Sequence, residues 1–492
     1  MNRALLRLSL ACLAMFVLLL ININYVQAFE ATSLAGKPGN SRTFYQQFQY
    51  QRGSIVANGD GTNLKIAESR LVKGGNGTYQ RVYPDGPVYA PVTGYDSIFS
   101  ATGMEAAEDK VLSGTAPQLQ VHNLISLITG KQKQGATVAL TISPRAQQAA
   151  YQALAQDGGH SGAVVAIDPS TGAILAMASY PTFNPNNYVT LNGTQLQKVD
   201  SRYRADPAQP LLNRAIEATY PPGSTFKIVT SSAAFATHTV AGPNTPVPAP
   251  TNLPIGNGHV LINDANEVCA NGNPPFIQAF WLSCNTAFGK LGIKLTGAVL
   301  HQYANAFGVN NPNLKIPLPV AASVVPLETD PAFTAFTAIG QFDDQVTPLQ
   351  EAMFSAAIAD GGTLMTPHLV QSVQAPDLST IESATPTPLS HPDSPTVASK
   401  VAQMMVQVTQ NPAGTAFGTA NASIVGVVIA GKTGTAQNGI NNTNLDDAVF
   451  TCFAPATNPR IAVGVIVKGG GFGSAAAAPI AVKVIQAYLK VK

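Results

Sequence analysis

A serine and a lysine three positions apart, Ser224 and Lys227, constrain this chain more than any other feature of its sequence. Residues 221–223 are Pro-Pro-Gly and end any preceding element, whereas the apolar residues 225–235 predict a helix. Ser224 is therefore expected at a helix N-terminus, with Lys227 one turn later on the same face. The helix dipole and burial disfavour a charged lysine there, so Lys227 is expected to be neutral and able to accept the serine proton. A serine that merely caps a helix would give the same letters.

A second pattern, Ser-x-Asn, occurs at Ser283-Cys284-Asn285 and presents a hydroxyl and an amide from one turn. The hydroxyl can relay a proton to or from Lys227, and the amide can bind a substrate carbonyl. On its own this pattern is common and fits a helix cap equally well.

A third pattern, Lys432-Thr433-Gly434 followed by Thr435, is expected at the end of a strand over residues 424–429. A lysine and a hydroxyl at a strand edge can bind a carboxylate, and the glycine allows a substrate to approach the backbone closely. The backbone N–H of Thr435 can complete an oxyanion hole, and the charge of Lys432 helps to keep the first lysine neutral. The three patterns in this order indicate acyl transfer through a serine nucleophile.

The same region contains a misleading match. Residues 426–433 read G-x-x-x-x-G-K-T, the letters of a phosphate-binding loop. Such a loop needs a glycine-rich turn that runs into a helix, whereas residues 427–430 are strand formers and a glycine follows the threonine. We therefore do not expect ATP binding.

Composition excludes two further classes of function. Only 11% of the residues are charged and the formal net charge is +2, so a nucleic acid is not an expected partner. The four cysteines lack the paired spacing of zinc sites and the seven histidines are scattered, so no metal site is expected.

The N-terminus predicts a membrane anchor. Arg3 and Arg7 precede an apolar run, about residues 8–29, that is about 20 residues long and sufficient to span a bilayer. Because basic residues favour the cytoplasmic side, the N-terminus is expected in the cytoplasm and the rest of the chain outside it. The alternative is a cleaved signal peptide with Val-Gln-Ala at 26–28 as the cleavage site. We favour a retained anchor over residues 1–29.

Two parts are expected after the anchor. Residues 30–155 show short strands and turns, a short helix at 105–112, a strand at 136–142 and a helix that Ser143 caps, without an obvious reactive group. Residues 156–492 carry the three patterns.

This second part is expected to be richer in core elements. Its predicted elements are strands at 162–168, 173–178, 448–454 and 461–468, an amphipathic helix at 347–358 and a final helix at 478–491. The stretches 239–258, 310–335 and 375–396 are rich in Pro, Gly or Asn and are expected to be surface excursions.

With these residues in view, the chain resembles the class B penicillin-binding proteins, which are monofunctional peptidoglycan D,D-transpeptidases. Arg52-Gly53-Ser54-Ile55 is similar to the signature near the start of their N-terminal domain, and residues 213–227 are similar to their nucleophile region. Gly340-Gln341 and Val346-Thr347-Pro348 resemble the helix before their third motif. The resemblance covers nearly the whole chain, and the modest length and the cysteine in Ser-Cys-Asn are most similar to the actinobacterial penicillin-binding protein A group.

The resemblance implies an α+β fold. The C-terminal transpeptidase domain would be an antiparallel sheet flanked by helices, and it would stand on a β-rich N-terminal pedestal similar to a dimerisation domain and on a transmembrane helix. The donor would be a stem peptide that ends in D-Ala-D-Ala, β-lactams would acylate the enzyme, and no cofactor would be needed. The resemblance also implies a membrane-embedded glycan polymerase of the SEDS family as a partner.

The resemblance further implies roles for the residues of the three patterns. Ser224 would be the nucleophile, Lys227 the general base and Ser283 the proton relay to the leaving amine. The remaining roles would be substrate binding, with Asn285 on the donor's peptide carbonyl, Lys432, Thr433 and Gly434 around its terminal carboxylate, and the N–H groups of Ser224 and Thr435 in the oxyanion hole.

The cysteine in the second pattern departs from the commonest form of the family. Cys269 is 15 residues before Cys284, and both are expected in an oxidising compartment, so we predict a disulfide between them and a free Cys452. Two buried thiols are the alternative.

Other activities fit the same residues. A β-lactamase or a D,D-carboxypeptidase would use the same patterns with water as the acceptor, and the large N-terminal part and the anchor favour cross-linking over drug hydrolysis. A non-catalytic scaffold or β-lactam sensor is a further alternative, against which the intact set of Ser224, Lys227 and Lys432 argues.

Overall fold

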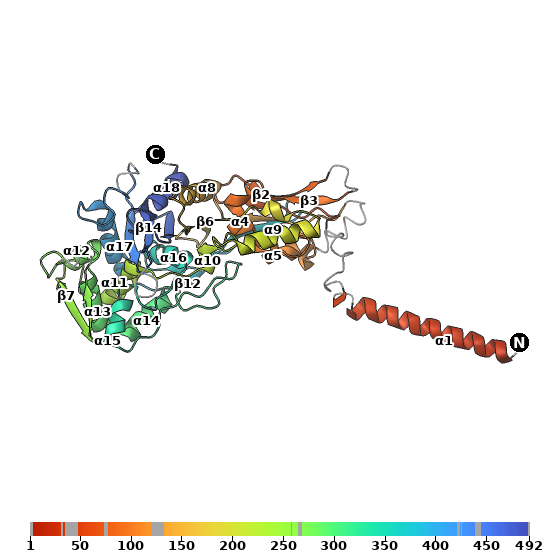
Figure 1. The fold of residues 1–492 in the computed structure, drawn as a ribbon, viewed down its shortest axis with the longest axis horizontal. Coiled ribbons are helices and arrows are strands. Elements are labelled where there is room, and N and C mark those ends of the chain that lie inside the picture. Colours follow the sequence, from red (N-terminus) through yellow and green to blue (C-terminus); the bar gives the residue numbers. More distant parts are fainter. Residues whose placement is uncertain are drawn as a thin grey trace.

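The computed structural model describes residues 3–30, 33–34, 48–72, 77–119, 132–256, 258–263, 268–420, 424, 426–437 and 444–490. Helix α1 (Arg3–Tyr25) continues into a π-helical turn, η1 (Val26–Glu30), and stands away from the rest of the protein (Figure 1). The span Leu5–Glu30 has a mean hydropathy of 2.3 and is long and apolar enough to cross a membrane.

The C-terminal part is built on a five-stranded antiparallel sheet with the order β13-β14-β15-β5-β6. Its strands are β5 (Gly162–Ile167), β6 (Ile174–Tyr180), β13 (Ala430–Ala436), β14 (Asp447–Ala454) and β15 (Ile461–Val467). Every residue of β5, β14 and β15 is buried, because helices cover both faces of the sheet. The expected antiparallel sheet flanked by helices is therefore confirmed.

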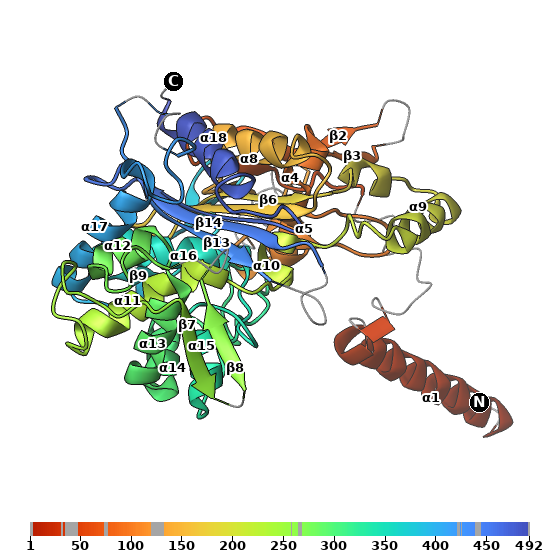
Figure 2. The same ribbon diagram turned by 60° about the vertical axis from the view of Figure 1, so that its left-hand side comes forward.

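Helices pack on the two faces in separate layers (Figure 2). Helices α8 (Pro144–Ala155) and α18 (Ala477–Leu489) lie on one face, and α16 (Pro348–Ala359) lies on the other. The Ser143 side chain caps α8 as expected by accepting a hydrogen bond from the Ala146 N–H. Each Val or Ile side chain buried between these layers contributes about 1.5–3 kcal/mol to the fold.

Helix α16 differs from its prediction. An amphipathic helix was expected over 347–358, but every residue from Pro348 to Ile358 is buried. The helix packs on the sheet and also against α17 (Pro395–Gln410) and α10 (Arg214–Glu217), so it has no solvent-facing side. It is the central helix of the domain and not a surface helix.

The N-terminal part contains a six-stranded sheet with the order β11-β10-β4-β1-β2-β3. Its strands are β1 (Ile55–Ala57), β2 (Leu64–Leu71), β3 (Tyr79–Val82), β4 (Thr137–Leu140), β10 (Val370–Gln374) and β11 (Thr380–Ser383). The last two strands come from much later in the chain. The stretch 375–396 lies mostly at the surface, as expected, but its residues 380–383 also form β11, the exposed edge strand of this sheet. Val373 and Ala375 bury their side chains against Leu119 and Ala136 of the N-terminal part, which explains why this hairpin joins the sheet.

The N-terminal part also holds short helices. The helix expected at 105–112 is two helices, α5 (Gly103–Ala107) and α6 (Asp109–Leu112), separated at Glu108. The others are α4 (Gly86–Thr93) and the 3-10 turn η2 (Pro117–Leu119).

A buried ion cluster ties the start of this part together. The Glu105 carboxylate accepts hydrogen bonds from the guanidinium groups of Arg52 and Arg81 at 2.7 and 2.6 Å. Glu105 is fully buried; burial alone would raise its pKa, but the two guanidinium groups outweigh burial and lower it. Arg52, which the resemblance placed in a family signature, thus has a structural role here.

The remaining elements of the C-terminal part surround the site. The helices are α9 (Gly193–Ala205), α11 (Lys227–Ala236), α12 (Phe276–Trp281), α13 (Asn285–Leu295), α14 (Gly297–Ala306) and α15 (Pro331–Thr337), with 3-10 turns η3 (Pro185–Tyr188) and η4 (Gly223–Phe226). Two short strand pairs join β7 (Asn252–Gly256) to β8 (His259–Ile262) and β9 (Leu364–Met365) to β12 (Pro388–Ser390).

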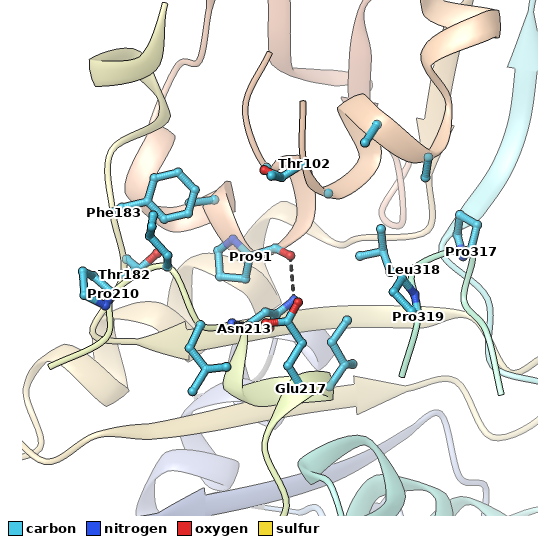
Figure 3. Close-up of a pocket in the computed structure, with 18 residues that line it drawn as sticks. Pro91, Thr102, Thr182, Phe183, Pro210, Asn213, Glu217, Pro317, Leu318 and Pro319 are labelled. Carbon is cyan, nitrogen blue, oxygen red and sulfur yellow. Dashed lines mark hydrogen bonds between the residues drawn. The ribbon is translucent and has the colours of Figure 1, made fainter. Parts of the chain in front are cut away.

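A pocket of about 430 Å³ lies where the two parts meet, between α4, α5 and α10 (Figure 3). Asn213 crosses this junction, because its Nδ2 donates a hydrogen bond of 2.8 Å to the Pro91 carbonyl. Its backbone N–H donates to the Glu217 carboxylate at 2.9 Å. The pocket does not contain any residue of the three sequence patterns, but it borders α10, which leads directly to Ser224.

Candidate active site

Ser224 lies in the 3-10 turn η4, and α11 begins only at Lys227. The sequence predicted one continuous helix that begins at Thr225, whereas the structure has a 3-10 turn up to Phe226 before the α-helix. Gly223 takes a φ of 56°, and a Cβ there would lie 2.8 Å from the Thr435 carbonyl oxygen. A Cβ on Gly434 would likewise lie 2.8 Å from the Pro222 carbonyl oxygen. The turn is tight because it packs directly on the backbone of β13.

Lys227 is fully buried and its Nζ lies at the centre of the site. It is 2.9 Å from Ser224 Oγ, 2.7 Å from the Ser283 carbonyl oxygen, 3.1 Å from Ser283 Oγ and 2.7 Å from Asn285 Oδ1. The Nζ is also 5.4 Å from the centre of the Phe288 ring. The first and second patterns therefore meet at one nitrogen, as the sequence predicted.

The turn that carries the second pattern is strained. Ser283 is a non-glycine residue with a φ of 61°, and residues in this region of backbone space persist where the surrounding structure holds them. This conformation directs both the carbonyl and the hydroxyl of Ser283 to Lys227. Asn285 is the first residue of α13, and α12 ends just before the turn, at Trp281.

The turn is also cross-linked. The structure joins Cys269 and Cys284 as a disulfide, with Cα atoms 5.8 Å apart, and leaves Cys452 as a buried free thiol. Because Cys284 lies between Ser283 and Asn285, the cross-link fixes the segment that presents both side chains.

The third pattern lies inside a strand, which corrects the prediction. Lys432, Thr433 and Gly434 are in the middle of β13, whereas residues 424–429 were expected to form the strand. Gly426 has a φ of 79°, which interrupts the apolar run, and the pairing with β14 begins only at Ala430. A strand at 430–436 also differs from the loop and helix of a phosphate-binding site.

Lys432 is fully buried and contacts the second pattern as well. Its Nζ is 2.9 Å from Ser283 Oγ and 2.9 Å from the Thr433 carbonyl oxygen, and it is 5.7 Å from the centre of the Phe280 ring. Ser283 Oγ therefore lies between two lysines. The Thr433 hydroxyl is held by that of Thr415 at 2.7 Å.

The backbone of Thr435 faces the nucleophile. Strand β13 is the edge strand of the sheet, and the Thr435 carbonyl accepts a hydrogen bond from the Gln341 side chain at 3.2 Å instead of from β14. The N–H and C=O of one residue point to the same side of an antiparallel strand. The Thr435 N–H therefore also points away from β14, toward the turn that carries Ser224.

Several contributors to the site were not predicted. Phe280 lies three residues before Ser283, and Phe288 lies three residues after Asn285. This placement of an aromatic residue on each side of the pattern could have predicted that their rings lie near the two lysines. Thr415 comes from a loop distant in sequence, and no local pattern marks it. Gln341 belongs to a pair that the resemblance singled out, but its contact with Thr435 was not predicted. Glu351 of α16 contacts the residue after the nucleophile, since its Oε1 lies 2.9 Å from Thr225 Oγ1.

Two family models match the chain. The penicillin binding protein transpeptidase domain matches residues 162–486, and the penicillin binding protein A dimerisation domain matches residues 52–138. The first match contains all five strands of the β13-β14-β15-β5-β6 sheet, and the second contains β1, β2 and β3 of the six-stranded sheet.

Characterised relatives cover the full length. The peptidoglycan D,D-transpeptidase PbpA of Mycolicibacterium smegmatis is 40% identical over 509 residues, which cover 100% of this chain and 99% of the relative. The PbpA of Mycobacterium tuberculosis is 40% identical over 511 residues with the same coverage.

Solved structures agree with these relatives. A structure of penicillin-binding protein A from M. tuberculosis as a ceftriaxone acyl-enzyme has a TM-score of 0.85 and 39% identity, and the match covers 90% of this chain and 100% of that one. The imipenem acyl-enzyme of the same protein gives a TM-score of 0.84 at 39% identity and the same coverage. The transpeptidase domain of a peptidoglycan glycosyltransferase from Eggerthella lenta gives 0.76 at 34% identity, with 90% and 99% coverage.

Proposed function

The chain belongs to the class B penicillin-binding proteins and is a peptidoglycan D,D-transpeptidase of cell-wall synthesis, and we propose that Ser224 is the residue through which it transfers the acyl group. The observation that carries this assignment is the convergence of three distant sequence patterns on one buried lysine, Lys227, with Ser224 Oγ only 2.9 Å away.

We propose that Lys227 is neutral, because its full burial and the nearby positive charge of Lys432 both disfavour an ammonium. A neutral amine has two N–H donors and one lone pair, and two of its partners, the Ser283 carbonyl and Asn285 Oδ1, accept hydrogen bonds. Donation to these two leaves the lone pair for the Ser224 hydroxyl. In this arrangement Lys227 takes the serine proton as Ser224 Oγ attacks.

In the acylation step, Ser224 Oγ bonds to the carbonyl carbon of the penultimate D-Ala of the donor stem peptide. The bond to the terminal D-Ala nitrogen then breaks, and the proton taken by Lys227 passes through Ser283 Oγ to the leaving amine. The amine of a neighbouring stem then attacks the resulting ester, and its proton passes through Ser283 Oγ to Lys227. Lys227 gives this proton to Ser224 Oγ as the ester bond breaks, which regenerates both residues. Dividing the transfer into two steps through an ester is covalent catalysis.

The other residues of the patterns bind the donor. The N–H groups of Ser224 and Thr435 hold the oxyanion that forms on the attacked carbonyl. Asn285 binds the peptide carbonyl of the donor. Lys432 and the Thr433 hydroxyl attract its terminal carboxylate, or the carboxylate of a β-lactam, and Gly434 leaves room for it beside the strand.

The test uses the full chain in detergent with a fluorescent penicillin. Intact mass should show one stable adduct, absent from Ser224→Ala and retained in the neighbouring control Ser231→Ala. Rapid drug hydrolysis without an adduct would instead indicate a β-lactamase. Neither adduct nor hydrolysis would indicate a binding scaffold.

We propose that α1 is a retained single-pass anchor with its N-terminus in the cytoplasm, so that the active site lies outside the membrane. Arg3 and Arg7, on the amino side of the apolar span, support this orientation. The division into an anchor at 1–29, a pedestal at 30–155 and a transpeptidase domain at 156–492 is supported by the limits of the two family matches. A protease added to intact spheroplasts should degrade the soluble domains but leave an N-terminal tag intact.

We also propose a membrane-embedded glycan polymerase of the SEDS family as the partner, since cross-linking acts on the stem peptides of newly made glycan strands. Cross-linking in the membrane should recover this polymerase with the wild-type chain. It should not recover it when the anchor is replaced by an unrelated apolar helix.

A further inference from the structure

A buried carboxyl group lies directly behind the nucleophile turn. Glu351 is in the middle of α16, is 0% exposed, and has its Oε1 2.9 Å from Thr225 Oγ1. Its Oε2 has no hydrogen-bond partner in the described part of the chain, and no salt bridge there involves it. An ionised carboxylate in such a position would be costly because neither water nor a cation compensates its charge.

The hydrogen-bond geometry indicates where the proton is. Thr225 Oγ1 is only 2.7 Å from the Pro222 carbonyl oxygen, and a carbonyl can only accept. The single hydroxyl proton of Thr225 therefore points to Pro222. A hydrogen bond between Thr225 and Glu351 then needs a second proton, and the carboxyl group has to supply it. Burial raises the pKa of Glu351 to about 8 and outweighs the hydrogen bond with Thr225, which acts in the opposite direction, so burial favours the neutral acid.

We propose that Glu351 is a positioning residue: as a neutral carboxylic acid it donates to Thr225, Thr225 donates to Pro222, and this chain of hydrogen bonds holds the turn that presents Ser224. The inference rests on the proposed role of Ser224. The same turn is held on its other side by the Gly223 N–H, which donates to the Gly340 carbonyl at 2.8 Å. Loss of the proton from Glu351 leaves two acceptor oxygens facing each other and releases one side of the turn.

The surroundings of Glu351 supply little charge. The neighbours that face it are Thr451 of β14, whose hydroxyl donates to the Glu351 carbonyl at 2.5 Å, and Gly464 of β15, which packs on its Cβ. Charged groups on the other elements packed against α16 or next to the turn have their own partners. On α10, Arg214 donates to the Ala208 and Gln209 carbonyls, and Glu217 accepts a hydrogen bond from Asn213. Lys400 of α17 donates to the Ala241 carbonyl, and Lys227 lies within the active site. Asp360 caps the C-terminal end of α16. Burial, and not a charged neighbour, is thus the dominant influence on this carboxyl group.

The test is the pH dependence of acylation by a fluorescent penicillin, measured with the full chain in detergent. Wild type is expected to lose acylation rate above about pH 8, where Glu351 ionises. Glu351→Gln keeps a donor of the same shape and cannot ionise, so it should acylate within about twofold of wild type at pH 7 and should lack this part of the alkaline decline. Glu351→Met has no donor and should acylate about tenfold more slowly at pH 7, without a matching loss of initial penicillin affinity.

A second pair of variants tests the relay without changing the charge. Thr225→Ser keeps the hydroxyl and should retain the wild-type pH profile, whereas Thr225→Val removes it and should be as slow as Glu351→Met. The double variant Thr225→Val/Glu351→Met should acylate no more slowly than either single variant, because both substitutions break the same chain of hydrogen bonds.

Thermal unfolding at pH 7 identifies variants that fail to fold. If Glu351→Met does not fold, Thr225→Val and Glu351→Gln are each compared with wild type instead. Superposable pH profiles for wild type and Glu351→Gln would overturn the proposal, and so would a Thr225→Val variant that acylates as fast as Thr225→Ser. If wild type itself formed no adduct, the assignment of Ser224 would fail. In that case an infrared difference spectrum between wild type and Glu351→Gln still reports whether a protonated buried carboxyl is present.

Discussion

Removal of the bridge between Cys269 and Cys284 should destabilise the domain and slow acylation. The bridge closes a loop of about 15 residues around α12, and in the chain-entropy treatment a loop of that length contributes about 3 kcal/mol to the free energy of unfolding. In a domain of this size that loss corresponds to a fall in Tm of about 4–5 °C. Because Cys284 separates Ser283 from Asn285, the loss should also loosen the contacts of both residues with Lys227.

The assay compares wild type with the double variant Cys269→Ser/Cys284→Ser, with and without reductant. Reductant should lower the Tm of wild type toward that of the double variant and leave the double variant unchanged. Cys452→Ala is the matched control, because it removes a buried free thiol and should keep the full response to reductant. Intact mass after alkylation of the unfolded chain without reductant should label Cys12 and Cys452 only.

A different result would refute this reasoning. Labelling of all four cysteines in unreduced protein would show that the bridge is absent. A double variant with wild-type Tm and wild-type acylation would show that the bridge forms but does not hold the Ser283 turn.

Other perturbations should give distinct signatures. Ser283→Ala should lower the acylation rate about 10²-fold or more while initial penicillin binding changes little, because a proton relay is lost and the pocket is kept; equal losses in rate and affinity would contradict the relay role. Glu105→Ala should cost about 3–5 kcal/mol in urea unfolding, since it removes the carboxylate that pairs with the buried guanidinium of Arg81, whereas Asp109→Ala, at an exposed end of the same cluster, should cost below about 1 kcal/mol. Burial raises the pKa of Glu351 from 4.5 to about 8, so the folded state keeps a proton that the unfolded chain releases. The free energy of unfolding should therefore fall between about pH 4.5 and 8, by an amount on the order of 3–5 kcal/mol. Glu351→Gln should abolish this decrease. Parallel stability curves for the two proteins over this pH range would contradict that assignment.

The sequence was sufficient to identify the chemical groups of the site because each lies in a short local pattern. Ser224 and Lys227 are one helical turn apart, and the other two patterns carry their side chains within a few residues of each other. The major strands were also predictable, because β5, β14 and β15 are continuous apolar runs.

What could not be predicted depends on tertiary packing. The left-handed φ of Ser283 and the 3-10 turn at Ser224 are imposed by the backbone of neighbouring elements, and neither residue type prefers them. The pairing of β10 with β4 joins residues more than 200 positions apart, a contact that no local pattern encodes. Helix α16 was predicted to be amphipathic because it carries polar residues, but these residues, among them Glu351, are buried.

The contacts of Ser283 also give a physical reason for the different roles proposed for the two lysines. Its Oγ is 3.1 Å from Lys227 Nζ and 2.9 Å from Lys432 Nζ, so the two nitrogens are no more than about 6 Å apart. Two positive charges at that separation repel by about 3 kcal/mol or more at an effective dielectric constant of about 20. In the proposed mechanism Lys432 stays charged to attract a carboxylate, so the repulsion would fall on Lys227 and favour the neutral amine that accepts the Ser224 proton. After that transfer the same repulsion would favour passage of the proton through Ser283 to the leaving amine. A donor carboxylate bound at Lys432 would reduce the repulsion and so make Lys227 a better base when a substrate is in place.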